Sequence, residues 1–230
     1  MLADPPPEAV LLDAYGTLLA LDDPVGALAD GLAEGGFPAA RDAVAEAFAA
    51  EVAHYRAHQD EGRDGPSLLA LRRDCAAVLA DALQPPRPPR DLVADLLATR
   101  LRYVLFPDVR PALDALLARG VRLAVVSNWD AGLPGVLDGL GIADRFAMIA
   151  PSATAGARKP NPAHFAFALR AMGVAASAAL HVGDDPDLDC TGATRAGIRA
   201  VLVDRDGRAG GGPWPRVSSL EALVGGPPGA

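Results

Sequence analysis

Positive charge, cysteine and lysine are all scarce in this 230-residue sequence, whose formal net charge is -8. A protein that binds nucleic acid or an anionic membrane surface needs a clustered basic face, so we expect neither partner. The two cysteines, Cys75 and Cys190, stand far apart and in no paired motif. We interpret both as free thiols of a reducing compartment.

Long apolar runs are also missing, and no run approaches the length of a membrane span. Asp4-Pro-Pro-Pro7 stands where a signal peptide would carry its apolar segment. We therefore expect a cytoplasmic protein that acts on a small molecule. Half of the residues are hydrophobic, enough to bury a core in one domain or in one domain with a sizeable insertion.

The shortage of lysine is the most specific of these features. Of the 21 Lys and Arg residues only Lys159 is a lysine, within Gly156-Ala-Arg-Lys-Pro-Asn-Pro162. Lysine offers a compact point charge, whereas arginine presents a planar fork that cannot replace it at a tight oxyanion site. The pattern favours a required ammonium group at this position, and chance survival on a solvated loop is the alternative.

The stretch from Ala9 to Leu19 carries the first candidate functional residue. A short apolar run ends on Asp13 and is followed at once by Gly16 and Thr17. Such a run is typical of a strand covered on both faces, and ligands bind at the carboxyl ends of parallel strands. Asp13 is therefore a candidate catalytic group, although it could instead cap the turn after the strand.

Between residues 25 and 105 the sequence predicts helices without convincing strands, which indicates a helical insertion. The expected helices cover 25–34, 41–58, 68–83 and 90–103. From residue 107 onward, helices alternate with short apolar strands. The expected strands there cover 122–126, 146–149, 178–182 and 199–203, and the expected helices cover 109–119, 131–140, 162–172 and 188–196.

This alternation predicts an α/β fold with a doubly wound, mostly parallel, Rossmann-like sheet and an inserted α-helical cap domain. We expect the core domain to comprise residues 1–17 and 107–230, of which 207–230 form a partly flexible tail, and the cap to comprise residues 18–106. The Gly210-Gly-Gly212 run and Pro227-Pro228 are interpreted as flexible loop and terminus.

Polar groups recur where the strands of the predicted sheet end. They are Asp13, then Ser127 and Asn128, then Lys159, and finally Asp184, Asp185 and Asp189. In a doubly wound sheet these ends lie over one crevice. Carboxylates can hold Mg²⁺, Lys and hydroxyl groups can neutralise phosphoryl oxygens, and a carboxylate can serve as a nucleophile. Each residue alone could be a turn cap, but together they indicate phosphoryl transfer.

Four motifs in this order resemble those of the haloacid dehalogenase (HAD) superfamily of hydrolases. They are Asp13-Ala-Tyr-Gly-Thr17, Ser127-Asn128, Lys159-Pro160 and Gly183-Asp-Asp-Pro-Asp-Leu-Asp189. The resemblance implies that Asp13 is the nucleophile and that Lys159 stabilises the attacked group. It also implies phosphate or leaving-group contacts from three further residues, Thr17, Ser127 and Asn128.

A Mg²⁺ site follows from the same resemblance. Its ligands would be Asp13, the backbone carbonyl of Tyr15 and Asp184, with Asp185 or Asp189 in support. The cap would close over the crevice and select the substrate. The cap sequence leaves a sugar phosphate, a nucleotide and a small acid phosphate equally open, and it does not indicate an oligomeric state.

Tyr15 is the departure from the pattern, because the phosphatases of this family usually carry a second Asp there as general acid and base. A phenol can protonate a leaving alkoxide but is a poor base near neutral pH. We therefore expect a slow phosphatase, or one that favours good leaving groups.

Two alternatives remain open from the sequence. Asp13-x-Tyr15-Gly-Thr also resembles the first motif of the metal-independent 2-haloacid dehalogenases, although three close acids in the fourth motif would repel a haloacid carboxylate unless a cation sits among them. A HAD-fold binding module with little or no turnover is the other alternative, and the retention of Asp13, Lys159 and Asp184 speaks against it.

Overall fold

The computed structural model describes residues 6–208 and 212–225, and it divides into two compact units. Unit 1 comprises Met1–Ala20 and Leu105–Ala230, and unit 2 comprises Leu21–Val104. The cap bounds expected from the sequence, 18 and 106, lie three and two residues outside those of unit 2. Each unit has its own hydrophobic core.

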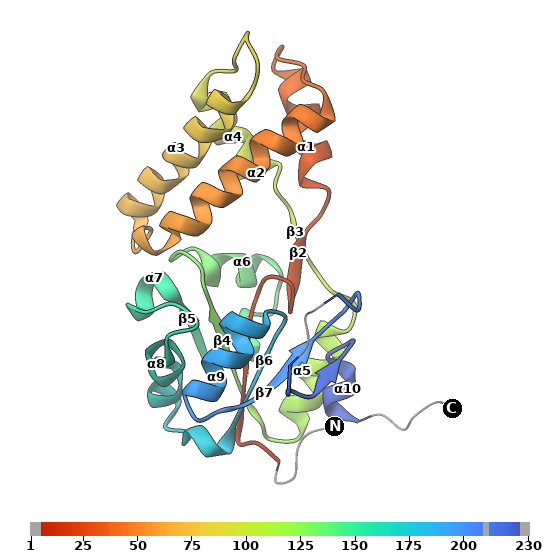
Figure 1. The fold of residues 1–230 in the computed structure, drawn as a ribbon, viewed down its shortest axis with the longest axis vertical. Helices are drawn as coiled ribbons and strands as arrows, with labels where there is room; N and C mark the ends of the chain where they lie inside the picture. The colour runs from red at the N-terminus through yellow and green to blue at the C-terminus, as the bar shows by residue number, and fades with distance from the viewer. Residues whose placement is uncertain (1–5, 209–211, 226–230) are drawn as a thin grey trace, which may run out of the picture. The chain divides into compact units, whose positions relative to one another are not determined.

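Unit 1 is built on a six-stranded parallel sheet (Figure 1). In spatial order its strands are β5 (Met148–Pro151), β4 (Arg122–Ser127), β1 (Ala9–Leu12), β6 (Ala179–Gly183), β7 (Arg199–Val203) and β8 (Arg216–Val217). Leu12 is paired with Val125 on one side and with Val182 on the other. The carboxyl ends of β4, β1 and β6 therefore come out side by side, which confirms the predicted doubly wound α/β class.

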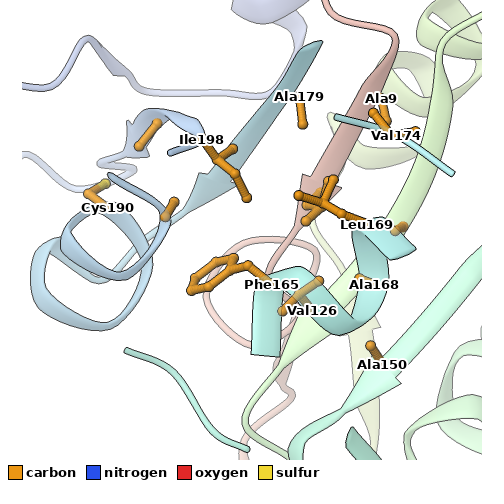
Figure 2. Close-up of a cluster of buried hydrophobic side chains, with 14 of the residues drawn as sticks. Ala9, Val126, Ala150, Phe165, Ala168, Leu169, Val174, Ala179, Cys190 and Ile198 are labelled. Carbon is orange, nitrogen blue, oxygen red and sulfur yellow. The ribbon is translucent and has the colours of Figure 1, made fainter. Parts of the chain in front are cut away.

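Helices cover both faces of this sheet, as its apolar strands require. Figure 2 shows one face, where Phe165 and Leu169 of α8 lie against Ala9 of β1 and Val126 of β4. The helices of unit 1 are α5 (Val109–Ala118), α6 (Leu133–Gly139), η2 (Ala143–Arg145), α7 (Ser152–Ala155), α8 (Pro162–Met172), η3 (Ala176–Ala178), η4 (Pro186–Thr191), α9 (Gly192–Arg195) and α10 (Glu221–Val224).

Three parts of unit 1 differ from the sequence prediction. The third strand covers Met148–Pro151 instead of 146–149. The helix expected at 188–196 is a π-helical turn, η4, followed by α9, and η4 begins early because the Asp185 carboxylate accepts hydrogen bonds from the next two free N–H groups. The predicted flexible tail contains β8 and α10 within residues 212–225. Residues 4 and 5 of the proline-rich start, residues 210 and 211 of the glycine run and residues 227 and 228 lie outside the described residues.

Unit 2 is a bundle of α1 (Pro24–Glu34), α2 (Arg41–His58), η1 (Gln59–Glu61), α3 (Gly65–Ala82) and α4 (Arg90–Thr99). Its core is apolar and includes Leu28, Leu32, Val44 and Leu79. Helix α3 starts three residues before the expected position. The reason is a capping box, in which the Asp64 carboxylate accepts from the N–H of Ser67 while the Ser67 hydroxyl accepts from the N–H of Asp64.

A short strand at the end of the stretch 25–105 corrects the expectation that this stretch contains helices only, and its partner strand lies before the stretch. β2 (Leu19–Leu21) and β3 (Tyr103–Leu105) form a two-stranded sheet on the two chain segments that join the units. The helix predicted to reach residue 103 ends at Thr99. Tyr103 and Val104 have side chains that prefer extended backbone, which favours the strand over a longer helix.

Within residues 6–208 and 212–225, no helix combines the length and the apolar character of a membrane span.

Candidate active site

The centre of the site is a buried ion-pair cluster at the carboxyl edge of the sheet. Asp13 directly follows β1, and its N–H donates to the carbonyl of Val182 on β6 at 3.0 Å. The Lys159 ammonium lies 2.5 Å from Asp13 Oδ1 and 2.5 Å from Asp189 Oδ1. All three residues are at most 6% exposed. The one lysine of the sequence is therefore a buried counter-charge between two carboxylates, as a required ammonium group would be.

The end of β4 positions both Asp13 and Lys159. The Ser127 hydroxyl donates a hydrogen bond to the Asp13 carboxylate. The Asn128 amide makes a reciprocal pair with the backbone of Lys159, accepting from its N–H at 2.7 Å and donating to its carbonyl at 3.1 Å. Asn128, predicted to contact phosphate, thus fixes the loop that carries the ammonium group.

The loop after β1 packs directly against Asp184. Thr17 is fully buried, and its hydroxyl donates to Asp184 Oδ1 at 3.4 Å. Gly16 has a φ of +83°, and a Cβ at this position would lie 2.3 Å from Asp184 Oδ2. Only glycine accommodates both the left-handed backbone and the close carboxylate. The Gly-Thr pair of the first motif therefore has a steric role next to the fourth.

The carboxylates of the acidic fourth motif have two different roles. One carboxylate oxygen from each of Asp13, Asp184 and Asp189 lies within 4.8 Å of the others. The Asp185 carboxylate instead caps η4, where its Oδ1 accepts from the N–H groups of Asp187 and Leu188, both at 2.8 Å. The structure therefore brings Asp184 and Asp189 to Asp13 and directs Asp185 to the turn.

Electrostatics in this cluster are dominated by burial and by an excess of negative charge. Burial raises the pKa of Asp13, while the Lys159 ammonium and the Ser127 hydroxyl act in the opposite direction. Burial and then the charges of Asp13 and Asp189 raise the pKa of Asp184 to about 7. The two carboxylates outweigh burial at Lys159 and raise its pKa, so the amine stays protonated.

His181 is a residue of this site that no sequence pattern predicts, because it stands inside an apolar run of β6. It is fully buried, and its Nε2 lies 2.9 Å from Asp189 Oδ1. Its Nδ1 is buried and has no hydrogen-bond partner among the described residues, and because a carboxylate only accepts, the contact with Asp189 is a donation from Nε2. Burial alone would raise the pKa of Asp189, but Lys159 and His181 together lower it below the ordinary range.

Tyr15 differs from its neighbours in exposure. Its side chain is 42% exposed, whereas Asp13 and Thr17 on the same loop are buried. Its backbone forms an isolated bridge with Leu19. The structure thus places the backbone of Tyr15 in the loop beside Asp13 and leaves its phenol accessible to solvent.

Comparisons with known proteins agree with this geometry. The sequence model of a family of hydrolases described as haloacid dehalogenase-like matches residues 7–197. A phosphoserine phosphatase of Thermus thermophilus is 39% identical over 131 residues, which are 55% of this chain and 51% of that protein. A phosphoglycolate phosphatase of Rhodospirillum rubrum is 39% identical over 100 residues, 43% of this chain and 41% of that protein.

A solved structure extends the similarity over almost the whole chain. The 2-haloacid dehalogenase of Pseudomonas syringae pv. tomato is 31% identical, with a TM-score of 0.65 over 94% of this chain and 95% of that one. In contrast, the alignments span only about half or less of the length of the two phosphatases.

Proposed function

The chain belongs to the family of haloacid dehalogenase-like hydrolases, and on that premise we propose that it is a Mg²⁺-dependent phosphatase of small phosphomonoesters. The membership confirms the resemblance seen in the four motifs and the assignment to the hydrolases. The substrate class, the metal and the roles of the individual residues are the proposal. The expected cytoplasmic location stays a prediction.

The observation that carries the proposal is the charge of the buried cluster. Asp13, Asp184 and Asp189 bring three carboxyl groups within 4.8 Å of one another, and Lys159 is the one cation bonded to them among the described contacts. The raised pKa of Asp184 reflects this excess. A divalent cation would balance it, and hard oxygen donors are the ligands that Mg²⁺ prefers.

The donor set fits such an ion. Asp13, Asp184 and the backbone carbonyl of Tyr15 would hold it, and Gly16 leaves the room beside Asp184 that a Cβ would fill. Asp189 would support the site indirectly, because both of its oxygens are engaged, by Lys159 and His181 on one and by the N–H of Asp185 on the other. When bound, Mg²⁺ would neutralise phosphoryl charge as it shifts in the transition state.

The reaction would use the residues around Asp13 as follows. The Asp13 carboxylate attacks phosphorus and forms an aspartyl-phosphate, while the bond from phosphorus to the ester oxygen breaks and the leaving alkoxide or phenoxide takes a proton from water. Lys159 stays cationic and offsets the charge of the attacked group, and Ser127 holds the nucleophile through its hydrogen bond. Water then hydrolyses the aspartyl-phosphate and releases inorganic phosphate. Since Tyr15 replaces the usual second Asp, this chain should turn over aryl phosphates, which need no protonation, faster than alkyl phosphates.

The experiment that tests the proposal is phosphate release from an aryl phosphate with Mg²⁺ and with EDTA. A panel of alkyl substrates should include phosphoserine and phosphoglycolate, which the names of the two phosphatase relatives indicate. Metal-dependent release that disappears in Asp13→Asn supports the proposal. If Asp13→Asn leaves all hydrolysis unchanged, the catalytic assignment fails and a binding module gains support.

A second candidate function is metal-independent 2-haloacid dehalogenation. Tyr15 and the 31% identity to a 2-haloacid dehalogenase favour it. There Asp13 would displace halide from carbon, and no leaving group would need a proton. Halide release from a 2-haloacid that persists in EDTA, without phosphate release from any ester, would replace the phosphatase proposal by this one.

A further inference from the structure

Arg205 lies in the loop that follows β7, and its side chain bonds to several groups outside the ion-pair cluster. Its Nη1 lies 3.0 Å from each carboxylate oxygen of Asp108. Its Nη2 donates to the carbonyl of Thr17 at 2.7 Å, and its Nε donates to the carbonyl of Gly16 at 3.3 Å. The guanidinium carbon lies 3.9 Å from the centre of the Phe106 ring.

These partners come from both chain segments that connect the two units. Gly16 and Thr17 precede the first crossing, which follows Ala20, while Phe106 and Asp108 come just after the second, which ends at Leu105. Phe106 also donates its N–H to the carbonyl of Leu18 at 3.1 Å. One guanidinium group thus bonds to both segments at the point where they enter unit 1.

Asp108 is committed to this arrangement. It occupies the N-cap position of α5 but makes no capping hydrogen bond with its side chain. Its carboxylate instead accepts from Arg205 and from the N–H of Leu220, at 2.6 Å. Asp108 is 8% exposed, so its charge is compensated by the guanidinium and not by water.

The loop that Arg205 holds is the one that packs against Asp184. A cavity of about 500 Å³ is lined by Gly16, Phe106 and Asp184 together with residues 203–206 and 208. Hydrogen bonds from Arg205 hold the loop on the side of this pocket. The C=O and N–H groups of a planar trans peptide point in opposite directions. A hydrogen bond that holds the Gly16 carbonyl therefore also fixes the direction of the Thr17 N–H.

We propose that Arg205 is a positioning residue for the proposed hydrolase reaction, which holds the Gly16–Thr17 backbone in register with Asp184 and Asp13. It acts through the loop and is not assigned a contact with substrate. The planar fork of arginine is needed because a lysine ammonium cannot reach a carboxylate and two backbone carbonyls with the same fixed geometry. The expected fall in kcat rests on the proposed function, whereas the expected ordering of the Gly16–Thr17 backbone does not.

The test compares Arg205→Lys and Arg205→Met with Arg145→Met. Arg145 is a matched control, because its side chain is 23% exposed against 20% for Arg205, and it also bonds to a carboxylate, that of Asp114, and to a backbone carbonyl, that of Gly141. It precedes β5, at the amino ends of the strands. Thermal unfolding of all three variants confirms that they fold.

Two measurements are made on the full chain. Hydrogen exchange followed by mass spectrometry should show faster exchange than in wild type for peptides covering residues 14–20 and 105–109 of both Arg205 variants. The same peptides of Arg145→Met should exchange at the wild-type rate. With an aryl phosphate and Mg²⁺, kcat should fall roughly 10- to 100-fold in both Arg205 variants with KM changed less than about threefold, since misplacement near the chemistry reduces the rate more than ground-state binding.

The outcomes separate this proposal from the proposed function. Unchanged exchange and unchanged kcat in Arg205→Met would overturn it, and so would equal losses in Arg145→Met. If the wild-type chain releases halide instead of phosphate, the same kcat comparison is made on halide release. If it releases neither, the phosphatase proposal fails, but the exchange experiment still tests the role of Arg205. Exchange rates equal to wild type in the Arg205 variants would then contradict that role.

Discussion

The two units of this chain differ most in what they bury. Of the thirteen buried polar or charged side chains in the described parts of the chain, eleven lie in unit 1 and only Glu51 and Gln59 lie in unit 2. Unit 2 is held together by an apolar core that includes Leu28 and Leu79. Burying charge is costly unless it is paired, so a cluster such as Asp13, Lys159 and Asp189 points to chemistry more than to stability.

Removing the central cation should have the largest effect on unit 1. Lys159→Met leaves Asp13 and Asp189 buried without their counter-charge, so the free energy of unfolding should fall by about 3–5 kcal/mol. The measurement is urea unfolding at pH 7. The control Arg90→Met breaks an exposed ion pair with Asp81 in unit 2 and should cost less than about 1 kcal/mol. Equal losses in the two variants would contradict the contrast between the units.

Metal binding should sharpen the contrast, because only unit 1 gathers carboxylates suited to an ion in the described residues. Mg²⁺ at about 100 times its Kd should stabilise the chain by about 2.7 kcal/mol, seen as a rise in Tm. Asp184→Asn should abolish this rise. Asp187→Asn removes an exposed carboxylate three residues away and should retain it. A rise that survives in Asp184→Asn would show that the ion binds elsewhere.

Loss of the buried histidine should have a smaller effect. His181→Leu removes the Nε2 donor from Asp189, so stability should fall by roughly 2 kcal/mol and kcat roughly 10-fold. His181→Gln keeps an N–H donor and should recover most of both losses. Urea unfolding and kcat with an aryl phosphate provide the comparison, and an activity equally low in both variants would indicate that packing, not the hydrogen bond, is what His181 contributes.

The smallest effect is expected from the buried acid of unit 2. Burial raises the pKa of Glu51, although a hydrogen bond from the Cys75 thiol acts in the opposite direction. The folded state then holds the proton more tightly than the unfolded state, so stability falls as pH rises from the unfolded pKa through the raised one. Glu51→Gln should therefore stabilise the chain by roughly 1 kcal/mol at pH 7 and hardly at pH 4.

Glu46→Gln, on the exposed side of the same helix, is the control and should show no such pH-dependent gain. Urea unfolding at the two pH values measures both variants. A stability loss in Glu51→Gln at pH 7 would contradict the prediction and mean that the buried carboxylate stabilises unit 2.

The strand-end residues could be predicted from the sequence because each follows an apolar run or sits in a loop between two such runs. Asp13 and Asp184 directly follow a strand, Ser127 is the last residue of one, and β4, β1 and β6 are neighbours in the sheet. Their convergence is a general property of parallel sheets. The order of the elements was therefore enough to gather the candidate site before any distance was known.

The contacts of His181 and Arg205 could not be predicted, because no local sequence pattern reveals which distant residues will meet in the fold. His181 stands among apolar residues as one more core position, and Arg205 stands between two aspartates in a stretch that could be any charged loop. Its bonds reach Gly16, 189 residues earlier, and Asp108, 97 residues earlier. The strands β2 and β3 were missed for the same reason, since each is only three residues long and is stabilised by the other.

The burial of Lys159 has a practical consequence for work with the protein. It is the one lysine in the sequence and is 3% exposed, with its amine held between two carboxylates. Amine-directed dyes, crosslinkers and immobilisation resins should consequently find almost no side chain to modify on the folded chain. Acylation of Lys159 would then report unfolding of unit 1, so an amine-reactive reagent can measure how much of the chain has lost the buried cluster.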